Sequence, residues 1–181
     1  SASINGLSDS LVETNSIWLG TDPSSSTSTA QYNLSVGTGS LDAITTGDNN
    51  TSIGYNAGSD LTDGADNVFI GSGAGDDTQS VTKSVIIGSG AGSAVMTTGA
   101  NGTIAIGYEA GKVLTSGAAN TFIGYQSGLA NTTGQHNTAT GYSSLVANVD
   151  GHYNTAIGAY ALKTQTSDDY NTAVGYEAGK V

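Results

Sequence analysis

This 181-residue chain has no cysteine, no arginine and few charged residues, and each of these features excludes a class of protein. Without cysteine the chain has neither disulfides nor thiolate metal ligands. Four lysines face fifteen acidic residues, and the formal net charge of −11 would repel phosphate backbones and anionic membranes. Nucleic acid is therefore a poor candidate partner. No apolar run reaches the length of a transmembrane segment.

Proline is also scarce, with Pro23 alone among 181 residues, whereas glycine occurs 27 times. The glycines lack the every-third spacing that a collagen triple helix requires, so collagen is excluded. Charged residues make up 10% of the chain, below the roughly 25% typical of soluble domains. Serine, threonine, asparagine and glycine supply the polar surface instead. This composition favours a β-rich fibre.

An internal repeat dominates the sequence. One glycine recurs every seventeen residues, except for a step of nineteen that indicates a two-residue insertion around Met96 to Gly102. The column consists of Gly20, Gly37, Gly54, Gly71, Gly88, Gly107, Gly124, Gly141, Gly158 and Gly175. This register predicts ten stacked coils of about seventeen residues.

Three further columns accompany the glycines. Nine of the ten residues immediately before them are aliphatic, which predicts a buried column: Leu19, Val36, Ile53, Ile70, Ile87, Ile106, Ile123, Thr140, Ile157 and Val174. Four residues before them stand Asn33, Asn50, Asn67, Asn120, Asn137, Asn154 and Asn171, with Ser16, Ser84 and Thr103 in the other coils. Just after them come Tyr55, Tyr108, Tyr125, Tyr142 and Tyr176.

Each coil opens on Asn-Thr-Ala-Ile-Gly or a variant, the alternating, β-branched pattern of a short strand. A weaker second segment leads to a corner glycine such as Gly64 or Gly134. We therefore predict two short strands and two turns per coil, that is, an all-β parallel β-roll. Equivalent residues should stack about 4.8 Å apart, with hydrogen bonds along the asparagine column and ring contacts along the tyrosine column.

The energetics of such a coil predict assembly. A column of about one buried isoleucine per coil contributes about 1.5–3 kcal/mol, against about 1–2 kcal/mol of backbone entropy for every residue. Burial between chains should supply the difference. A second apolar column, two residues before the glycines, is the predicted interface between chains: Trp18, Phe69, Ile86 and Phe122.

The units NTFIGYQSG at 120–128, NTAIGAYAL at 154–162 and NTAVGYEAG at 171–179 resemble the repeats of trimeric autotransporter adhesin heads and phage tail fibres. The resemblance runs from about Asn15 to Val181, so residues 15–181 are predicted to be the repeat domain and residues 1–14 a connecting segment. It implies a homotrimer of left-handed β-rolls, with apolar faces buried around a threefold axis and the outer surface offered to a host receptor, matrix or neighbouring cell.

Candidate chemical sites are few. His136 and His152 lie in adjacent coils and are either imidazole metal ligands or polar turn residues. The aspartates around 76–77 and 168–169 do not recur in register, which favours solvated turn charges over a calcium site. The segments GSGAGD at 71–76 and GSGAGS at 88–93 lack the remaining residues of a phosphate-binding loop. No catalytic residue, cofactor or metal is expected, and the chain is not expected to be an enzyme.

The function predicted from the sequence is a structural and adhesive fibre segment that is extracellular, on a cell surface or part of a virion. Its partners would be further copies of itself, in a homotrimer or an end-to-end polymer, and a host-surface receptor or glycan. The alternative is an ice-binding β-solenoid, because Thr51, Thr121, Thr138, Thr155 and Thr172 form a partial column. Aliphatic residues at Ile17, Leu34, Val68, Val85 and Ile104 interrupt this column.

Overall fold

A computed structural model describes residues 10–13, 15–21, 23 and 27–179. Its one sheet has eleven strands in chain order. β1 (Ser10–Glu13) pairs antiparallel with β2 (Ser16–Gly20), and every later strand pairs parallel with the strand before it. These are β3 (Leu34–Gly37), β4 (Thr51–Ile53), β5 (Val68–Ile70), β6 (Val85–Ile87), β7 (Ile104–Ile106), β8 (Thr121–Ile123), β9 (Thr138–Thr140), β10 (Thr155–Ile157) and β11 (Thr172–Val174). The predicted parallel β-solenoid is confirmed.

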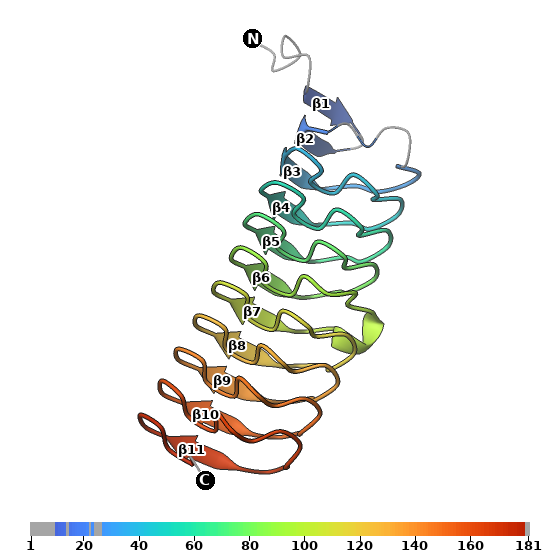
Figure 1. Cartoon of the computed structure of the whole chain (residues 1–181). Helices are drawn as coiled ribbons and strands as arrows, with labels where there is room; N and C mark the ends of the chain where they lie inside the picture. The colour runs from blue at the N-terminus through green and yellow to red at the C-terminus, as the bar shows by residue number, and fades with distance from the viewer. Residues whose placement is uncertain (1–9, 14, 22, 24–26, 180–181) are drawn as a thin grey trace.

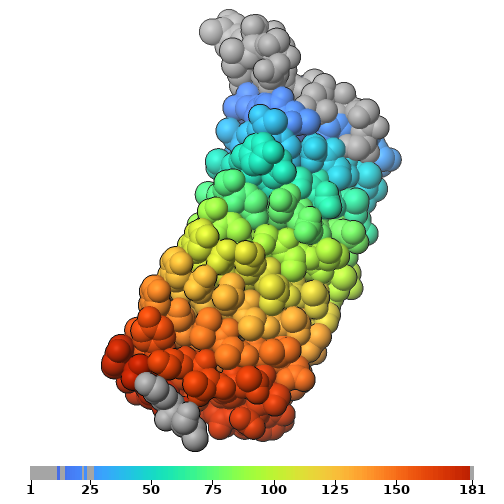
Figure 2. Space-filling view, in the orientation of Figure 1, coloured from blue at the N-terminus to red at the C-terminus, as the bar shows by residue number. Residues whose placement is uncertain are grey.

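The coils stack into a rod, with the N-terminal and C-terminal coils at opposite ends (Figures 1 and 2). The two-residue insertion forms a short 3-10 helix, η2 (Thr98–Ala100), at the side of the rod. Val85 still pairs with Ile104, so the insertion leaves the sheet register intact, as predicted. β1 lies within the predicted connecting segment. It pairs along β2 and forms the N-terminal edge of the sheet.

The prediction of a second strand in each coil is wrong. In the described coils no second strand follows each parallel strand: turns and bends, and in one coil the 3-10 helix η2, lead to the next strand. Left-handed residues such as Asn49 (φ 59°) and Asp66 (φ 61°) recur at one position of successive coils and interrupt an extended backbone. Backbone hydrogen bonds nevertheless join the turns of adjacent coils, as from Thr62 N–H to Gln79 O at 2.9 Å.

The inner and outer faces of the strands are the reverse of the prediction. The residues immediately before the glycines point outward: Ile53 and Ile123 are each 37% exposed and Ile157 is 42% exposed. The column two residues before the glycines is buried instead: Trp18, Ser35, Ser52, Phe69, Ile86, Ala105, Phe122, Ala139, Ala156 and Ala173. Side chains alternate along a strand, and the asparagines stand two positions before this column. The column and the buried asparagines therefore point to the same, inner face.

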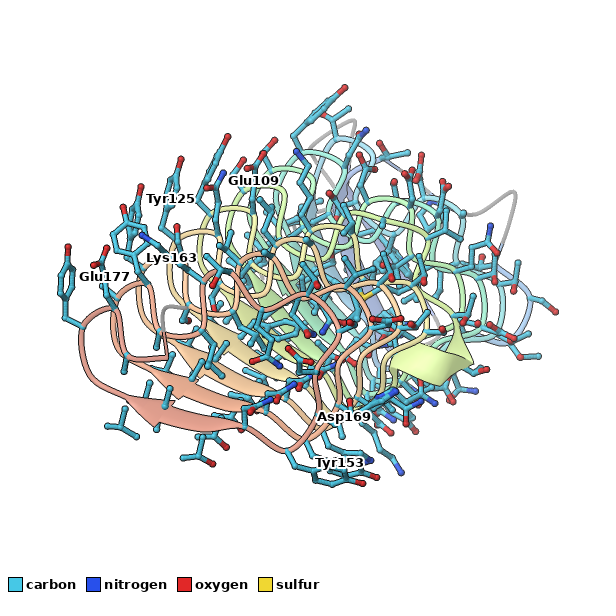
Figure 3. The ribbon with its side chains drawn as sticks, turned by 60° about the horizontal axis from the view of Figure 1, so that its bottom comes forward. Glu109, Tyr125, Tyr153, Lys163, Asp169 and Glu177 are labelled. Carbon is cyan, nitrogen blue, oxygen red and sulfur yellow. The ribbon has the colours of Figure 1, made fainter. Side chains whose placement is uncertain are left out.

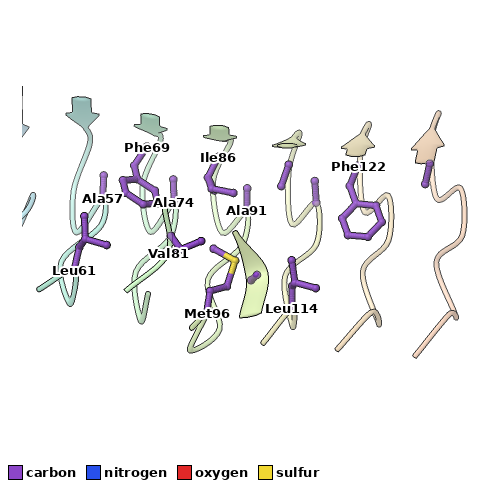
Figure 4. Close-up of a cluster of buried hydrophobic side chains, with 14 of the residues drawn as sticks. Ala57, Leu61, Phe69, Ala74, Val81, Ile86, Ala91, Met96, Leu114 and Phe122 are labelled. Carbon is purple, nitrogen blue, oxygen red and sulfur yellow. The ribbon is translucent and has the colours of Figure 1, made fainter. Parts of the chain in front are cut away.

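A single chain therefore builds its own core, and the prediction that one chain buries too little is wrong. Strand residues Phe69, Ile86 and Phe122 meet residues from the turns, among them Leu61 and Leu114 (Figure 4). The turns contribute the apolar volume that a strand-only estimate misses. The predicted interface column is the centre of this core.

The core is filled by matching large residues with small ones. Phe122 packs against Gly128, whose added Cβ would collide with the phenyl ring. In the next coil the strand supplies Ala139, and the same turn position holds a buried leucine, Leu145. Leu145 adopts a left-handed conformation (φ 52°) to fill this space. These two adjacent coils thus fill the same part of the interior with different residues.

The recurring glycines are required by both conformation and contact. Gly54 has φ 142°, and a Cβ there would lie 2.5 Å from the carbonyl oxygen of Gly71 in the next coil. An L-residue rarely adopts this backbone conformation, and the neighbouring atom is backbone that cannot turn away. The seventeen-residue glycine period therefore records a point at which the backbones of successive coils approach closely.

Candidate functional site

The outer face of the sheet is a continuous repetitive surface along the rod. Each parallel strand sends its central side chain inward and the two flanking side chains outward, which produces two exposed columns. We call this surface, formed by β2 to β11, the sheet face. Its first column is Ile17, Leu34, Thr51, Val68, Val85, Ile104, Thr121, Thr138, Thr155 and Thr172, and its second is the column immediately before the glycines.

The sheet face is uncharged and rich in β-branched residues. Neither of its columns contains an acidic or basic side chain among the residues from Ile17 to Val174. Ten coils and strands of three residues give it a length of about 45 Å and a width of about 10 Å. An uncharged, largely apolar patch of that size is in the range that marks a functional surface on a single chain.

The middle and the C-terminal end of the sheet face differ. β5, β6 and β7 expose only valine and isoleucine. From β8 to β11 the first column is threonine throughout, as Thr121, Thr138, Thr155 and Thr172. From β5 to β11 the face thus changes from aliphatic to mixed aliphatic and hydroxyl.

A stack of tyrosines stands at the turns that follow the strands. Tyr108, Tyr125 and Tyr142, which we call the tyrosine ladder, have ring centroids 5.1 and 5.0 Å apart and nearly parallel planes. Tyr160 meets the edge of Tyr142 at 5.2 Å. The predicted ring stacking along this column is confirmed for these three tyrosines. Figure 3 shows Tyr125 at this corner and Tyr153 at the opposite end of the strands.

A salt bridge and a glutamine side chain lie beside the tyrosine ladder. Lys112 Nζ lies 2.6 Å from Glu109 Oε1, and Gln126 Nε2 donates to Glu109 Oε2 at 2.8 Å. The hydrogen bond from Lys112, followed by that from Gln126, lowers the pKa of Glu109. Partial burial between neighbouring rings raises the pKa of Tyr125, with smaller effects from Tyr142 and Tyr108. The ladder therefore lies beside a carboxylate that already has two side-chain donors.

A second aromatic stack borders the start of the strands. His136, Tyr153 and Tyr170 have ring centroids 5.1 Å apart at each step and planes within 9°. His136 belongs to this stack, whereas Nδ1 of His152 accepts the backbone N–H of Gln135 at 3.0 Å. Each histidine thus contacts the adjacent coil at a turn, His136 by ring stacking and His152 by a hydrogen bond. Among the described residues, no group of three or more acidic or histidine side chains is placed to hold a metal ion.

Several aspartates link neighbouring coils. Asp76 Oδ1 accepts from Ser59 Oγ at 2.5 Å, and Asp169 Oδ1 accepts from the backbone of His152 at 2.6 Å. The segments 71–76 and 88–93 form equivalent stacked turns, joined by the bond from Gly75 N–H to Ala91 O at 2.9 Å. These contacts give the acidic and glycine-rich segments a role within the solenoid.

Two features of the turns escaped sequence reasoning. The first is the stack of His136, Tyr153 and Tyr170, although three aromatic rings five residues before successive glycines are a readable signal. The second is a pair of buried amides, Asn131 and Asn148, in a column that elsewhere holds residues such as Leu114. Within the described part of the chain, neither side-chain polar atom of Asn131 has a hydrogen-bond partner.

Comparison with protein families, with curated proteins and with solved structures finds no match to this chain. The resemblance to adhesin heads and tail fibres therefore rests on the quoted repeat units alone. In the described part of the chain, no helix has the length and apolar character needed to cross a membrane.

Proposed function

We propose that this chain is a structural and adhesive fibre segment in which copies assemble side by side through the sheet face. The observation that carries the proposal is the uncharged double column of β-branched residues along β2 to β11. Exposed apolar area of this extent is costly in water, and its burial is the main favourable contribution to association.

A second copy of the chain is the partner that best matches this face. The repeat gives every coil the same spacing along the rod, so two copies can place their columns in contact at the same interval throughout. Homo-oligomers with closed symmetry are the usual outcome of such self-complementary surfaces. The sequence resemblance favours a homotrimer of left-handed rolls, with the three sheet faces turned toward the axis.

In this arrangement the turns form the outer surface of the fibre. The tyrosine ladder and the acidic turns would then be available to a receptor or glycan on a host or neighbouring cell. The proposed role is non-enzymatic and extracellular or virion-borne, in keeping with a surface made mainly of serine, threonine, asparagine and glycine.

The test is the mass and shape of the chain in solution, by light scattering with small-angle X-ray scattering. The expected result is a rod containing three chains. Ile123→Lys places a charge on the sheet face and should shift the rod toward single chains. Val113→Lys is the matched control, because Val113 is also 37% exposed but lies outside the sheet. A wild-type chain that stays a monomer at high concentration would contradict the proposal.

A second candidate function, ordering of water at ice surfaces, is favoured by the threonine column of β8 to β11. Thr121, Thr138, Thr155 and Thr172 are direct neighbours in register on the sheet face. The measurement is thermal hysteresis of the purified chain, with Thr138→Lys as the disrupting variant. A monomer with hysteresis that this variant abolishes would favour this function over the fibre, whereas an assembled rod without hysteresis would reject it.

A further inference from the structure

The tyrosine column is interrupted for two coils. In the position that follows the glycine, four successive coils hold Tyr55, Ser72, Ser89 and Tyr108. Their backbones stack directly, since Gly73 N–H donates to Tyr55 O at 2.8 Å, and equivalent bonds of 3.0 Å continue from Ser72 and Ser89 to the next coils. At about 4.8 Å per coil, the Tyr55 and Tyr108 rings stand about 14 Å apart.

The residues between these two rings are small. Ser72 and Ser89 are exposed, and Gly73 and Gly90 beside them have no side chain. A Cβ added to Gly73 would find only Asp76 Oδ2, at 3.9 Å, among the atoms within 4 Å, and one added to Gly90 would find only Glu109 Cγ, at 3.6 Å. The surface between the rings is therefore low and open, and we call it the tyrosine gap.

The ring faces at the two ends of the tyrosine gap are available. Tyr125, stacked on both sides, is 41% exposed, whereas Tyr108, stacked on one side, is 47% exposed. Tyr55 is 62% exposed and contacts no other described aromatic ring. The side of Tyr108 that looks toward Ser89 thus carries no ring.

We propose that the tyrosine gap binds a pyranose ring of a neutral glycan, which deepens the proposed adhesive function and rests on it. The apolar face of a pyranose stacks on the electron-rich face of tyrosine, at a spacing like that within the ladder. Its hydroxyls have the Ser72 and Ser89 hydroxyls and the Asp76 carboxylate as polar partners. A few polar groups beside an aromatic wall are the usual composition of a small-ligand site.

Charge selects among glycans. The chain carries a net charge of −11, and Asp76 and Glu109 stand at the margins of the tyrosine gap, so acidic sugars would be repelled. Neutral hexoses and N-acetylhexosamines meet no such repulsion. The inferred ligand is therefore a neutral terminal sugar of a surface glycan.

The test is saturation-transfer NMR on the assembled protein with three separate probes: methyl β-galactopyranoside, methyl α-mannopyranoside and N-acetylglucosamine. The closing variant is Ser72→Tyr combined with Ser89→Tyr, which continues the ladder through the gap. Thr38→Tyr is the matched control, because it adds a ring on the far side of Tyr55 and leaves the gap open. We expect at least one probe to bind wild type and control equally, and the closing variant at least tenfold more weakly.

The inference would be overturned by the absence of transfer from wild type to all three probes, or by equal binding by the closing variant. Methyl glucuronide should bind at least tenfold more weakly than the best neutral probe, and equal binding would also count against the inference. Light scattering on every variant keeps the two proposals separate. A trimer without sugar binding rejects the inference alone, whereas a monomer that binds sugar through the gap rejects the fibre proposal and retains the site.

Discussion

The side chains of Asn33 and Asn50 form one step of a buried hydrogen-bonded ladder. Asn33 Oδ1 accepts both the backbone N–H of Asn50, at 2.9 Å, and its Nδ2, at 3.1 Å. Asn50 Nδ2 also donates to the carbonyl oxygen of Gly64 at 2.9 Å. One amide therefore joins the start of a strand to the preceding coil and to the distant corner of its own coil.

Asn50→Ala should lower the free energy of unfolding by about 3 kcal/mol, because buried backbone groups lose their partners. These are the N–H of Asn67, which donates to Asn50 Oδ1 at 3.1 Å, and the carbonyl of Gly64. Denaturant unfolding followed by circular dichroism is the measurement.

Asn50→Ser is the informative control for this prediction. At the same position of another coil, Ser84 Oγ accepts the backbone N–H of Thr103 at 3.2 Å and donates to the nearby carbonyl oxygen of Thr82 at 3.2 Å. Serine at position 50 therefore keeps the acceptor for the next coil and loses the hydrogen bond to the Gly64 carbonyl. Its effect should lie between wild type and alanine. An alanine variant as stable as wild type would show that the ladder contributes little.

The period of the repeat predicts the parallel stacking, the register across the insertion and the asparagine ladder, because each depends on identical residues recurring at one spacing. The interior was predicted wrongly for a different reason. Strand alternation gives two opposite faces, and the apolar residues around Ile70 occupy both. The column immediately before the glycines is the more regularly aliphatic of the two, and for that reason it was predicted to be buried.

The asparagine column could have shown which strand face points inward. A residue such as Asn67 shares its face with Phe69, two positions along the strand, and both are buried. The core contributed by turn residues such as Leu145 was harder to foresee, because it requires left-handed backbone at an apolar residue. Ring stacks at the turns are readable from the sequence where one column holds aromatic residues in adjacent coils, although only the tyrosine column was predicted.

Asn131→Leu should raise stability, by about 1–3 kcal/mol, because it removes a buried amide that lacks a described protein partner and adds apolar contact. Leucine occupies the same position of the preceding coil, as Leu114, and is fully buried there. Thermal and denaturant unfolding both report the change.

Asn120→Leu is the matched comparison, with the same substitution at an equally buried amide that is fully used. Asn120 Nδ2 donates to the carbonyls of Gly117 and Gly134, and its Oδ1 accepts from the backbone of Asn137. This variant should lose about 3 kcal/mol or more. If the two variants changed stability in the same direction, hydrogen bonding would not be the cause.

Phe122→Ala should cost about 3–5 kcal/mol, since it leaves a cavity in the core. Gly128→Leu alone should also destabilise the protein, because its side chain would meet the phenyl ring. Together the two changes reproduce the Ala139 and Leu145 pair of the next coil and should recover most of the loss. A double variant as unstable as the sum of the single ones would refute the matched packing, and a double-mutant cycle measures the coupling.

The ion pair beside the tyrosine ladder makes a pH-dependent prediction. Hydrogen bonds from Lys112 and Gln126 lower the pKa of Glu109 in the folded state below the ordinary value of a glutamate carboxyl. The stabilisation they give is therefore fully present above the unfolded-state pKa and is lost as pH falls through the folded-state pKa. Side-chain carboxyl NMR should show Glu109 titrating below an ordinary glutamate, and Lys112→Met should move its midpoint upward. Gln126→Ala should produce a smaller upward shift, since Lys112 has the larger effect, and a midpoint unmoved by Lys112→Met would show that the ion pair does not persist in solution.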